Sequence, residues 1–262
     1  MITSLQIGEN GRLGNQMFQL AAAIGTAAII KSDWYLHEEG HDLWDIFELK
    51  NTKKLDEDLK KKIKFRYKET GFYFNPSVFC VDKFTDLYGY FQSPLYFDHA
   101  KKLIREEFKF KSDILDRSAS LLSSLAKENE VSCSIHVRRT DYLKNPDYHP
   151  TCSKEYYLEA MKIIERSTNK KIKFILFGDD YDWIENNIFK DNCIIVKGNN
   201  AEIDMCTMSL CNAHIIANSS FSWWAAALGN YNSVISPSKW FGTTGPRNWN
   251  TISVSNTQLT QP

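Results

Sequence analysis

One segment of this 262-residue chain has the residue types best suited to binding a ligand or catalysing a reaction: a histidine, two adjacent arginines and an aspartate. The segment is His136-Val-Arg138-Arg139-Thr-Asp141, where an apolar run at 131–137 ends. Alternate side chains of a strand share a face, so His136 and Arg138 can meet one ligand while Arg139 points to the opposite side. A guanidinium pairs bidentately with phosphate, which suits Arg138 to neutralising a diphosphate. A structural ion pair between Arg139 and Asp141 is the alternative interpretation.

A second polar turn follows the apolar run at 214–217 and leads into a predicted helix. It contains Asn218, Ser219 and Ser220. Hydroxyl groups and backbone N–H groups at a helix N-terminus favour binding of a phosphate. Simple helix capping by Ser220 and Ser222 is the alternative.

A third turn is rich in glycine and reads Gly8-Glu-Asn-Gly11-Arg12-Leu-Gly14-Asn15-Gln16. Glycines allow a ligand to approach the backbone closely, so Arg12, Gly14 and Asn15 are candidate phosphate-binding residues. A tight turn with Asn15 as helix cap is an equally good interpretation. The turn contains neither a lysine P-loop nor the G-x-G-x-x-G spacing, which argues against nucleotide triphosphatases and dinucleotide dehydrogenases.

Acidic residues after the apolar run at 172–177 offer a metal-based alternative. Asp180 and Asp182 form a D-x-D triplet, and such a pair of carboxylates can hold Mg²⁺ or Mn²⁺ against a diphosphate. Because Asp179 or Asp180 can instead cap the helix that follows, we rank capping first.

Another carboxylate, Asp204, lies beside Glu202 at a predicted helix start. It can accept hydrogen bonds from the N1 and N2 donors of guanine, or simply complement the helix dipole.

The elements that position these residues alternate regularly in the second half of the chain. Short apolar runs lie at 131–137, 172–177, 193–196, 214–217 and 233–236, with helical stretches such as 154–165 and 201–211 between them. This β-α rhythm predicts a parallel sheet with its ligand at the strand ends, at a topological switch point.

The first half is less regular. A strand at 2–7 and a helix at 16–30 form one β-α unit, followed by helices at 95–108, opened by Ser93 and Pro94, and at 112–127. The polar residues 128–130 then predict a boundary between domains 1–130 and 131–262.

Composition excludes several classes of protein. With 43% hydrophobic residues and 32 basic against 32 acidic residues, the chain is typical of globular proteins and unlike a dedicated nucleic-acid binder. Its apolar runs fall short of the roughly 20 residues of a membrane span, and its start lacks a signal-peptide pattern, so we expect a cytoplasmic protein. Trp223, Trp224 and the six cysteines are expected to be buried apolar groups, with neither disulfides nor structural zinc.

The segment from Lys50 to Lys68 is rich in lysine and has helical periodicity. We expect a solvated helix face here. The alternative is peripheral contact with an anionic membrane, to which lysines contribute about 1 kcal/mol each.

Taken together, four motifs resemble those of the α-1,2-fucosyltransferases of glycosyltransferase family 11. They are Gly11-Arg-Leu-Gly-Asn-Gln-Met-Phe-Gln19, His136-Val-Arg-Arg-Thr-Asp141, Phe177-Gly-Asp-Asp180 and Ile215-Ile-Ala-Asn-Ser-Ser-Phe-Ser-Trp-Trp224. The resemblance implies an α/β, GT-B-like fold, with two Rossmann-like domains whose parallel sheets face each other across a cleft. Residues 1–130 would be the acceptor side, and residues 131–262 would bind GDP-fucose.

The activity implied by this resemblance is the metal-independent, inverting transfer of L-fucose from GDP-fucose to the 2-hydroxyl of a terminal galactoside. No cofactor is implied, because GDP-fucose is a substrate. The acceptor would be a galactose-terminated oligosaccharide or a lipid-linked glycan. The alternatives are a non-catalytic GDP-sugar or glycan binding module, and a metal-dependent transferase that uses Asp180 and Asp182.

The resemblance also assigns roles to single residues. Arg138 would contact the β-phosphate, His136 the nucleoside and Asp204 the guanine. The full set of expected donor-binding residues is Arg12, Gly14, Asn15, His136, Arg138, Arg139, Asp204, Asn218, Ser219 and Ser220. Arg138, Asn15 and Asp141 are the catalytic candidates, and no residue is identified as the general base.

Overall fold

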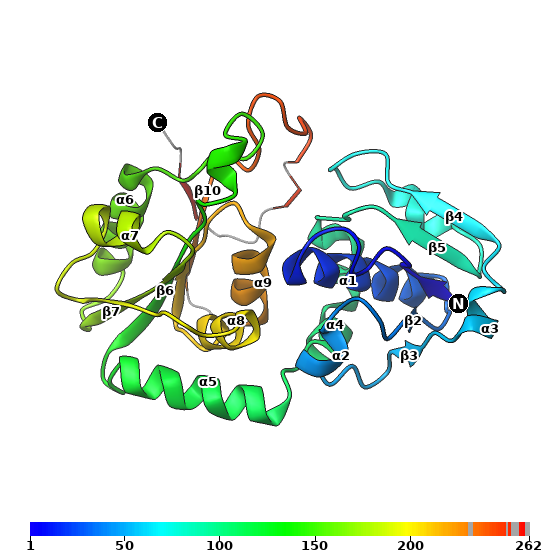
Figure 1. The fold of residues 1–262 in the computed structure, drawn as a ribbon, viewed down its shortest axis with the longest axis horizontal. Coiled ribbons are helices and arrows are strands. Elements are labelled where there is room, and N and C mark those ends of the chain that lie inside the picture. The colour runs from blue at the N-terminus through cyan, green and yellow to red at the C-terminus, as the bar shows by residue number, and fades with distance from the viewer. Residues whose placement is uncertain (230–232, 250, 253–256, 260–262) are drawn as a thin grey trace. The chain divides into compact units, whose positions relative to one another are not determined.

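The computed structural model describes residues 1–229, 233–249, 251–252 and 257–259, which form an α/β protein (Figure 1). Its described residues divide into two compact units. The first unit comprises Met1–Lys111 with 248, 249, 251 and 252, and the second comprises Ser112–Arg247 with 257–259. Helix α5 (Ser112–Leu125) therefore belongs to the second unit, where it packs on α8, whereas the sequence predicted a boundary after this helix at 128–130.

A six-stranded sheet with entirely parallel pairing organises the second unit. The strand order is β11-β10-β9-β6-β7-β8. The strands are β6 (Val131–Val137), β7 (Ile172–Gly178), β8 (Cys193–Ile195), β9 (Ala213–Ile215), β10 (Ser233–Pro237) and β11 (Thr257–Leu259). All five strands predicted in this half are confirmed, since runs of buried apolar residues are what a sheet covered on both faces requires.

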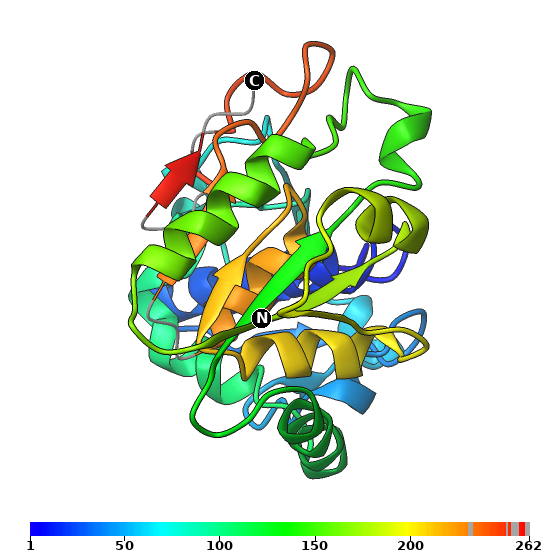
Figure 2. The same ribbon diagram turned by 90° about the vertical axis from the view of Figure 1, so that its left-hand side faces the viewer.

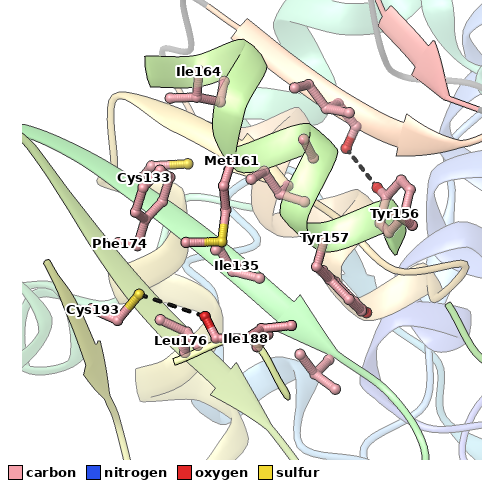
Figure 3. Packing of buried hydrophobic residues seen from close by; sticks show 14 of the residues in the cluster. Cys133, Ile135, Tyr156, Tyr157, Met161, Ile164, Phe174, Leu176, Ile188 and Cys193 are labelled. Atoms are coloured by element: carbon pink, nitrogen blue, oxygen red, sulfur yellow. Dashed lines mark hydrogen bonds between the residues drawn. The ribbon is translucent and has the colours of Figure 1, made fainter. Parts of the chain in front are cut away.

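Helices cover both faces of this sheet (Figure 2). They are α6 (Lys154–Arg166), α7 (Tyr181–Asn187), α8 (Ala201–Ser209) and α9 (Ser220–Leu228), and a 3₁₀ helix spans Tyr142–Lys144. Alternate residues of β6 point to α6, so that Cys133 and Ile135 pack with Tyr157, Met161 and Phe174 in a fully buried cluster (Figure 3). Helices α8 and α9 pack against each other on the other face.

Apart from α1, the first unit consists of short elements. Its parallel sheet has the order β1-β5-β4, and a parallel pair joins β2 to β3. The strands are β1 (Ile2–Thr3), β2 (Tyr35–Leu36), β3 (Lys53–Lys54), β4 (Phe65–Lys68) and β5 (Thr85–Tyr88). The helices are α1 (Leu13–Ile29), α2 (Leu43–Ile46), α3 (Glu57–Lys60) and α4 (Lys101–Glu107), with 3₁₀ helices at Pro76–Cys80, Pro94–Tyr96 and Asp98–Ala100.

Predictions for the start of this unit were only partly right. The strand expected at 2–7 stops after Thr3, because the backbone N–H of Leu5 donates to the carboxylate of Asp86 (2.8 Å) instead of continuing the ladder. The helix expected at 16–30 begins earlier and has Arg12 at its N-cap, so the prediction of Asn15 as cap is wrong.

The single helix expected at 95–108 is also wrong. It is divided at Phe97, whose backbone (φ −144°, ψ 3°) is not helical. At this point α1 approaches closely, since a Cβ on Gly25 would lie 2.1 Å from the carbonyl oxygen of Tyr96. Tertiary packing therefore overrides local helix propensity here.

The lysine-rich segment forms β3, α3 and β4 instead of one helix, which corrects the expected helical periodicity. Its lysines form exposed ion pairs. The pairs are Lys50–Glu48, Lys53–Asp33, Lys54–Glu38, Lys60–Glu57 and Lys61–Asp58. This surface thus carries mixed charge, which weakens the case for binding an anionic membrane.

No helix within the described ranges has the length and apolar character needed to cross a membrane.

Most of the residues expected to be buried are buried. Trp223 (2% exposed) and Trp224 (1%) lie in the core, which confirms that they are core residues and not a sugar platform. All cysteines except Cys80 are buried, and none of the six, all within the described ranges, forms a disulfide bond. Cys80 is exposed at the end of a surface 3₁₀ helix, so the expectation of burial was wrong for it.

Candidate functional site

The order of strands in the second unit places a topological switch point beside β6. From β6 the chain moves outward through β7 and β8, and then returns to β9 on the opposite side of β6. In open parallel sheets, ligands bind at the carboxyl ends of the two strands that flank such a point. The histidine-arginine segment follows β6 and the serine turn follows β9, so the topology brings these two predicted motifs to one edge.

Arg138 is held between two carboxylates at the end of β6. Its Nη2 lies 2.5 Å from Oδ2 of Asp141, and its Nη1 lies 3.0 Å from Oδ2 of Asp179. The guanidinium also lies 5.7 Å from the ring centroid of Tyr142. The predicted pairing of Asp141 with Arg139 is wrong, because Asp141 pairs with Arg138. The side chain of Arg138 retains 18% exposure, so the fixed guanidinium remains accessible to an anion.

Arg139 points to the opposite face, as strand alternation predicted. Its Nε lies 3.0 Å from Oδ2 of Asp180, and its guanidinium stacks 4.2 Å from the ring centroid of Trp183 on α7. These contacts give Arg139 a scaffold role, and its expected contact with the donor stays a prediction.

Asp179 and Asp180 fix the loops around the arginines. Asp179 accepts hydrogen bonds from the Arg139 backbone N–H (2.8 Å) and the Thr140 hydroxyl (2.8 Å). Oδ1 of Asp180 accepts the backbone N–H of Trp183 (3.2 Å), which confirms the predicted cap of α7.

Asp182, the second member of the D-x-D triplet, lies exposed on α7. Asp180 already uses one oxygen for the helix cap and the other for Arg139. Within the described ranges, no group of three or more His, Cys, Asp or Glu residues is arranged to hold a metal ion.

His136 is buried on the face of β6 opposite α6. Its ring centroid lies 5.4 Å from that of Phe221 on α9, and its Nδ1 has no hydrogen-bond partner among the described residues. Burial, followed by the positive charge of Arg138, lowers the pKa of His136 to about 4. The imidazole is therefore neutral at pH 7, with a ring nitrogen left for a ligand.

Hydrogen bonds of Asn218 hold the loop after β9 in place. Its amide nitrogen donates to the carbonyl groups of Pro150 (2.9 Å) and Trp240 (2.9 Å), so this side chain is engaged in the fold. The backbone carbonyl oxygen of Asn218 accepts a hydrogen bond from the hydroxyl of Tyr142 (3.0 Å), which connects the loop after β9 to the loop after β6.

Ser219 occupies the N-cap of α9 with an extended backbone, and its side chain makes no capping hydrogen bond. The alternative in which Ser220 and Ser222 cap the helix is wrong. Ser220 is the first helical residue, and the Ser222 hydroxyl is directed back toward the carbonyl groups of Ala217 and Ser219. The N-terminus of α9 therefore presents a partial positive charge and a serine hydroxyl at this edge.

Asp204 lies in the first turn of α8. Because α8 follows β8 of the parallel sheet, its N-terminus is at the same carboxyl edge as Arg138. Burial, opposed by a hydrogen bond from Asn199 (3.1 Å), raises the pKa of Asp204 to about 6.

The glycine-rich turn belongs to the first unit. Gly8 and Gly11 have φ values of +95° and +89°, and a Cβ on Gly11 would lie 2.3 Å from Nδ2 of Asn15. Asn15 accepts a hydrogen bond from Gln92 (2.7 Å), Arg12 is exposed, and Gly14 is buried in the first turn of α1. Their expected contacts with the donor stay predictions.

Sequence reasoning missed Glu69, which follows β4. Its Oε2 accepts the backbone N–H groups of Tyr90 (2.7 Å) and Phe91 (3.0 Å), whereas its buried Oε1 has no partner among the described residues. Burial raises its pKa to about 7. The only signal in the sequence was an acidic residue before Thr-Gly at the end of a strand that was itself predicted as helix.

Comparison with known proteins gives a consistent picture. The model of glycosyl transferase family 11 matches residues 2–240. An alpha-1,2-colitosyltransferase of Escherichia coli is 31% identical, with coverage of 88% of this chain and 90% of the relative. The O-antigen biosynthesis glycosyltransferase WbnK of Escherichia coli is 30% identical, with coverage of 88% of this chain and 93% of the relative. The mouse galactoside alpha-(1,2)-fucosyltransferase 1 is 25% identical, with coverage of 87% of this chain and 64% of the relative.

Among solved structures, the NodZ alpha-1,6-fucosyltransferase soaked with GDP-fucose matches with a TM-score of 0.58 at 16% identity, over 90% of this chain and 94% of that one. POFUT1 in complex with GDP matches with a TM-score of 0.55 at 13% identity, over 90% and 96%. These likenesses concern the fold, and they confirm the predicted α/β, GT-B-like class.

Proposed function

The chain belongs to glycosyl transferase family 11, and we propose that it transfers L-fucose from GDP-fucose to the 2-hydroxyl of a terminal galactoside, with inversion and without a metal ion. The family membership supports a glycosyltransferase. The mouse galactoside alpha-(1,2)-fucosyltransferase and the Escherichia coli alpha-1,2-colitosyltransferase support the α-1,2 linkage, and the ligands of the NodZ and POFUT1 structures support the GDP-linked donor.

The observation that carries the proposal is the accessible guanidinium of Arg138 beside the N-terminus of α9 at the switch point. As the bond from C1 of fucose to the diphosphate breaks, negative charge grows on the departing oxygen. Two carboxylates hold Arg138 in place in advance, so its remaining N–H groups can stabilise that charge without reorganisation. The dipole of α9 and the Ser219 hydroxyl add to the same effect.

His136 and Asp204 supply donor recognition in this proposal. The neutral, unpartnered Nδ1 of His136 can hydrogen-bond the nucleoside, and the carboxylate of Asp204 can accept the N1 and N2 hydrogens of guanine. Both residues lie in the second unit, which we therefore assign as the donor side.

Metal independence rests on what the acidic residues already do. Arg138 supplies positive charge for the diphosphate, while both oxygens of Asp180 are committed to Arg139 and to the cap of α7. A metal ion bound by Asp180 would have to share both carboxylate oxygens with these contacts.

A second candidate donor is a colitose donor, because the 31% identical relative is an alpha-1,2-colitosyltransferase. Colitose is L-fucose without its 3-hydroxyl group. A site that hydrogen-bonds this hydroxyl discriminates strongly against the analogue that lacks it, so the ratio of kcat/KM for the two donors decides between them.

The proposal is tested by incubating the protein with GDP-fucose and a panel of β-galactosides and β-glucosides. We expect release of GDP, a mass gain of one deoxyhexose on galactosides, and an α-1,2 linkage by NMR. GDP should inhibit competitively against GDP-fucose, and UDP and ADP should not. GDP release without any glycan product, or equal inhibition by UDP, would contradict it.

The acceptor is proposed to be the galactose-terminated end of an oligosaccharide or of a lipid-linked glycan. The similarity to WbnK, an O-antigen biosynthesis glycosyltransferase, supports a glycan acceptor. A cytoplasmic location belongs to the same proposal, and peripheral contact with a membrane through Lys50 to Lys68 stays a prediction.

A further inference from the structure

One tyrosine of the loop after β6 contacts both features of the second unit that are suited to an anion. The guanidinium of Arg138 lies over the ring of Tyr142, 5.7 Å from its centroid. The hydroxyl of Tyr142 donates to the backbone carbonyl oxygen of Asn218 (3.0 Å), and Asn218 directly precedes Ser219, the N-cap of α9. A single side chain therefore connects Arg138 to the segment that begins α9.

The ring of Tyr142 holds the guanidinium in a way that the two carboxylates cannot. The N–H groups of a guanidinium lie in its plane, so Asp141 (2.5 Å) and Asp179 (3.0 Å) contact Arg138 through its edge. An aromatic ring instead attracts a cation through its π face. Loss of the ring would leave both ion pairs in place and remove the surface over which the guanidinium rests.

Other aromatic side chains hold the ring of Tyr142 itself. The ring of His149 stacks on it, with centroids 4.6 Å apart and an interplanar angle of 19°. His149 also packs against Tyr148 (4.6 Å) and Phe241 (5.8 Å). The backbone N–H of Gly242 donates to the carbonyl oxygen of Tyr148 (2.9 Å), which joins the loop after β6 to the loop after β10. The orientation of Tyr142 is therefore set by the fold before a ligand binds.

The hydrogen bond from Tyr142 to Asn218 is present at every working pH. Burial raises the pKa of Tyr142 well above its ordinary value, although the positive charge of Arg138 acts in the opposite direction. The hydroxyl thus stays protonated and remains a donor. The acceptor is equally fixed, because the side-chain amide of Asn218 donates to the carbonyl groups of Pro150 and Trp240 (2.9 Å each).

We propose that Tyr142 is a positioning residue, which holds the guanidinium of Arg138 and the N-terminus of α9 at a fixed spacing so that both contact one diphosphate. The inference rests on the proposed function. Tyr142 acts through Arg138 and takes no part in making or breaking bonds. Because a displacement of about 1 Å can cost about 100-fold in rate, a residue that fixes this spacing contributes to both donor binding and turnover.

The test is a double-mutant cycle on GDP affinity, measured by calorimetry for Tyr142→Leu, Arg138→Ala and the variant that combines them. We expect Tyr142→Leu to weaken GDP binding about tenfold in the wild-type background and less than about twofold in the Arg138→Ala background. Tyr142→Phe keeps the ring and loses only the hydroxyl, so it should weaken binding about threefold. Should the leucine variant fail to fold, the same cycle with Tyr142→Phe decides the role.

Tyr156→Phe is the matched control. Tyr156 is a buried tyrosine of the same unit whose hydroxyl also donates to a carbonyl group of the segment after β9, that of Ile216 (2.6 Å). Its replacement should lower the melting temperature and leave GDP affinity unchanged.

Two outcomes would overturn the role of Tyr142 and leave the proposed function standing. One is wild-type GDP affinity in a folded Tyr142→Leu protein, and the other is equal weakening by Tyr142→Leu in the two backgrounds. Failure of the wild type to transfer fucose to any galactoside would instead overturn the proposed function. The cycle on GDP needs no acceptor, so it decides the role of Tyr142 in that case as well.

Discussion

Arg138 in the second unit and Glu69 in the first unit differ in how completely their side chains are paired. In the second unit, Arg138 and Arg139 are each fixed by carboxylates, so positive charge is fully positioned before any substrate arrives. In the first unit, Glu69 is anchored through one oxygen while the other has no partner among the described residues. Stabilising a departing diphosphate requires a charge that is already in place, which the second unit provides.

This contrast supports the proposal that the second unit binds the donor. Substitutions at the end of β6 should therefore weaken GDP binding, whereas a substitution of Glu69 in the first unit should leave GDP binding unchanged.

The largest effect is expected for Arg138→Ala in the second unit. Loss of a positioned donor to developing charge costs about 10²–10³-fold in kcat, and the carboxylates of Asp141 and Asp179 would be left without their cation. Arg138→Lys should restore little, because lysine lacks the planar fork. Steady-state kinetics with GDP-fucose measure both, and wild-type turnover in Arg138→Ala would remove the donor site from the end of β6.

A smaller effect, visible in both binding and stability, is expected for Asp204→Asn. The raised pKa of Asp204 means that the folded state favours its neutral form. Protonation of Asp204 therefore stabilises the folded state. This contribution is fully present below pH 3.8, the ordinary pKa of an aspartate, and is lost as the pH rises through about 6, the pKa of Asp204 in the folded state. At pH 7.5 the ionised carboxylate therefore costs the fold up to about 3 kcal/mol.

Asp204→Asn should accordingly unfold at a higher temperature than the wild type at pH 7.5, and at nearly the same temperature at pH 4. It should also weaken the preference for GDP over UDP by about tenfold, since asparagine cannot accept two hydrogens as a carboxylate does. Thermal unfolding at the two pH values and nucleotide inhibition measure these effects. An unchanged GDP preference would reduce Asp204 to a complement of the helix dipole.

The smallest effect is expected for Asp182→Asn and for removal of metal ions. The Asp182 side chain is exposed, so its replacement should change the unfolding free energy by less than about 0.5 kcal/mol. Activity in excess EDTA should equal activity without it. Complete loss in EDTA, restored by Mn²⁺ and reproduced by Asp182→Asn, would favour the metal-dependent alternative.

The strands of the second unit could be predicted from the sequence more accurately than those of the first unit. Strands β6 and β7 were predicted almost to the residue, because nearly continuous apolar runs are typical of strands buried on both faces. Strand β1 was overestimated, since its end depends on a hydrogen bond from Leu5 to Asp86, far along the chain. Short strands with distant partners leave too little local pattern to be recognised.

The residues of the candidate site also differ in how well they could be predicted from the sequence. His136 and Arg138 could be selected because their types and alternation carry the chemistry within one segment. The partner of Arg138 was missed in part, since Asp179 reaches it only through the pairing of β6 with β7. Glu69 gave no usable signal, because its burial and its half-satisfied carboxyl come from residues at the end of β5.

Calorimetric titration of GDP into the wild type, Arg138→Ala and Glu69→Gln tests the central division of roles most directly. The account predicts that GDP binds the wild type and Glu69→Gln with equal affinity, and binds Arg138→Ala at least about 30-fold more weakly, as expected for a lost charge-assisted phosphate contact of about 2 kcal/mol. Equal GDP affinity in Arg138→Ala and the wild type would contradict it.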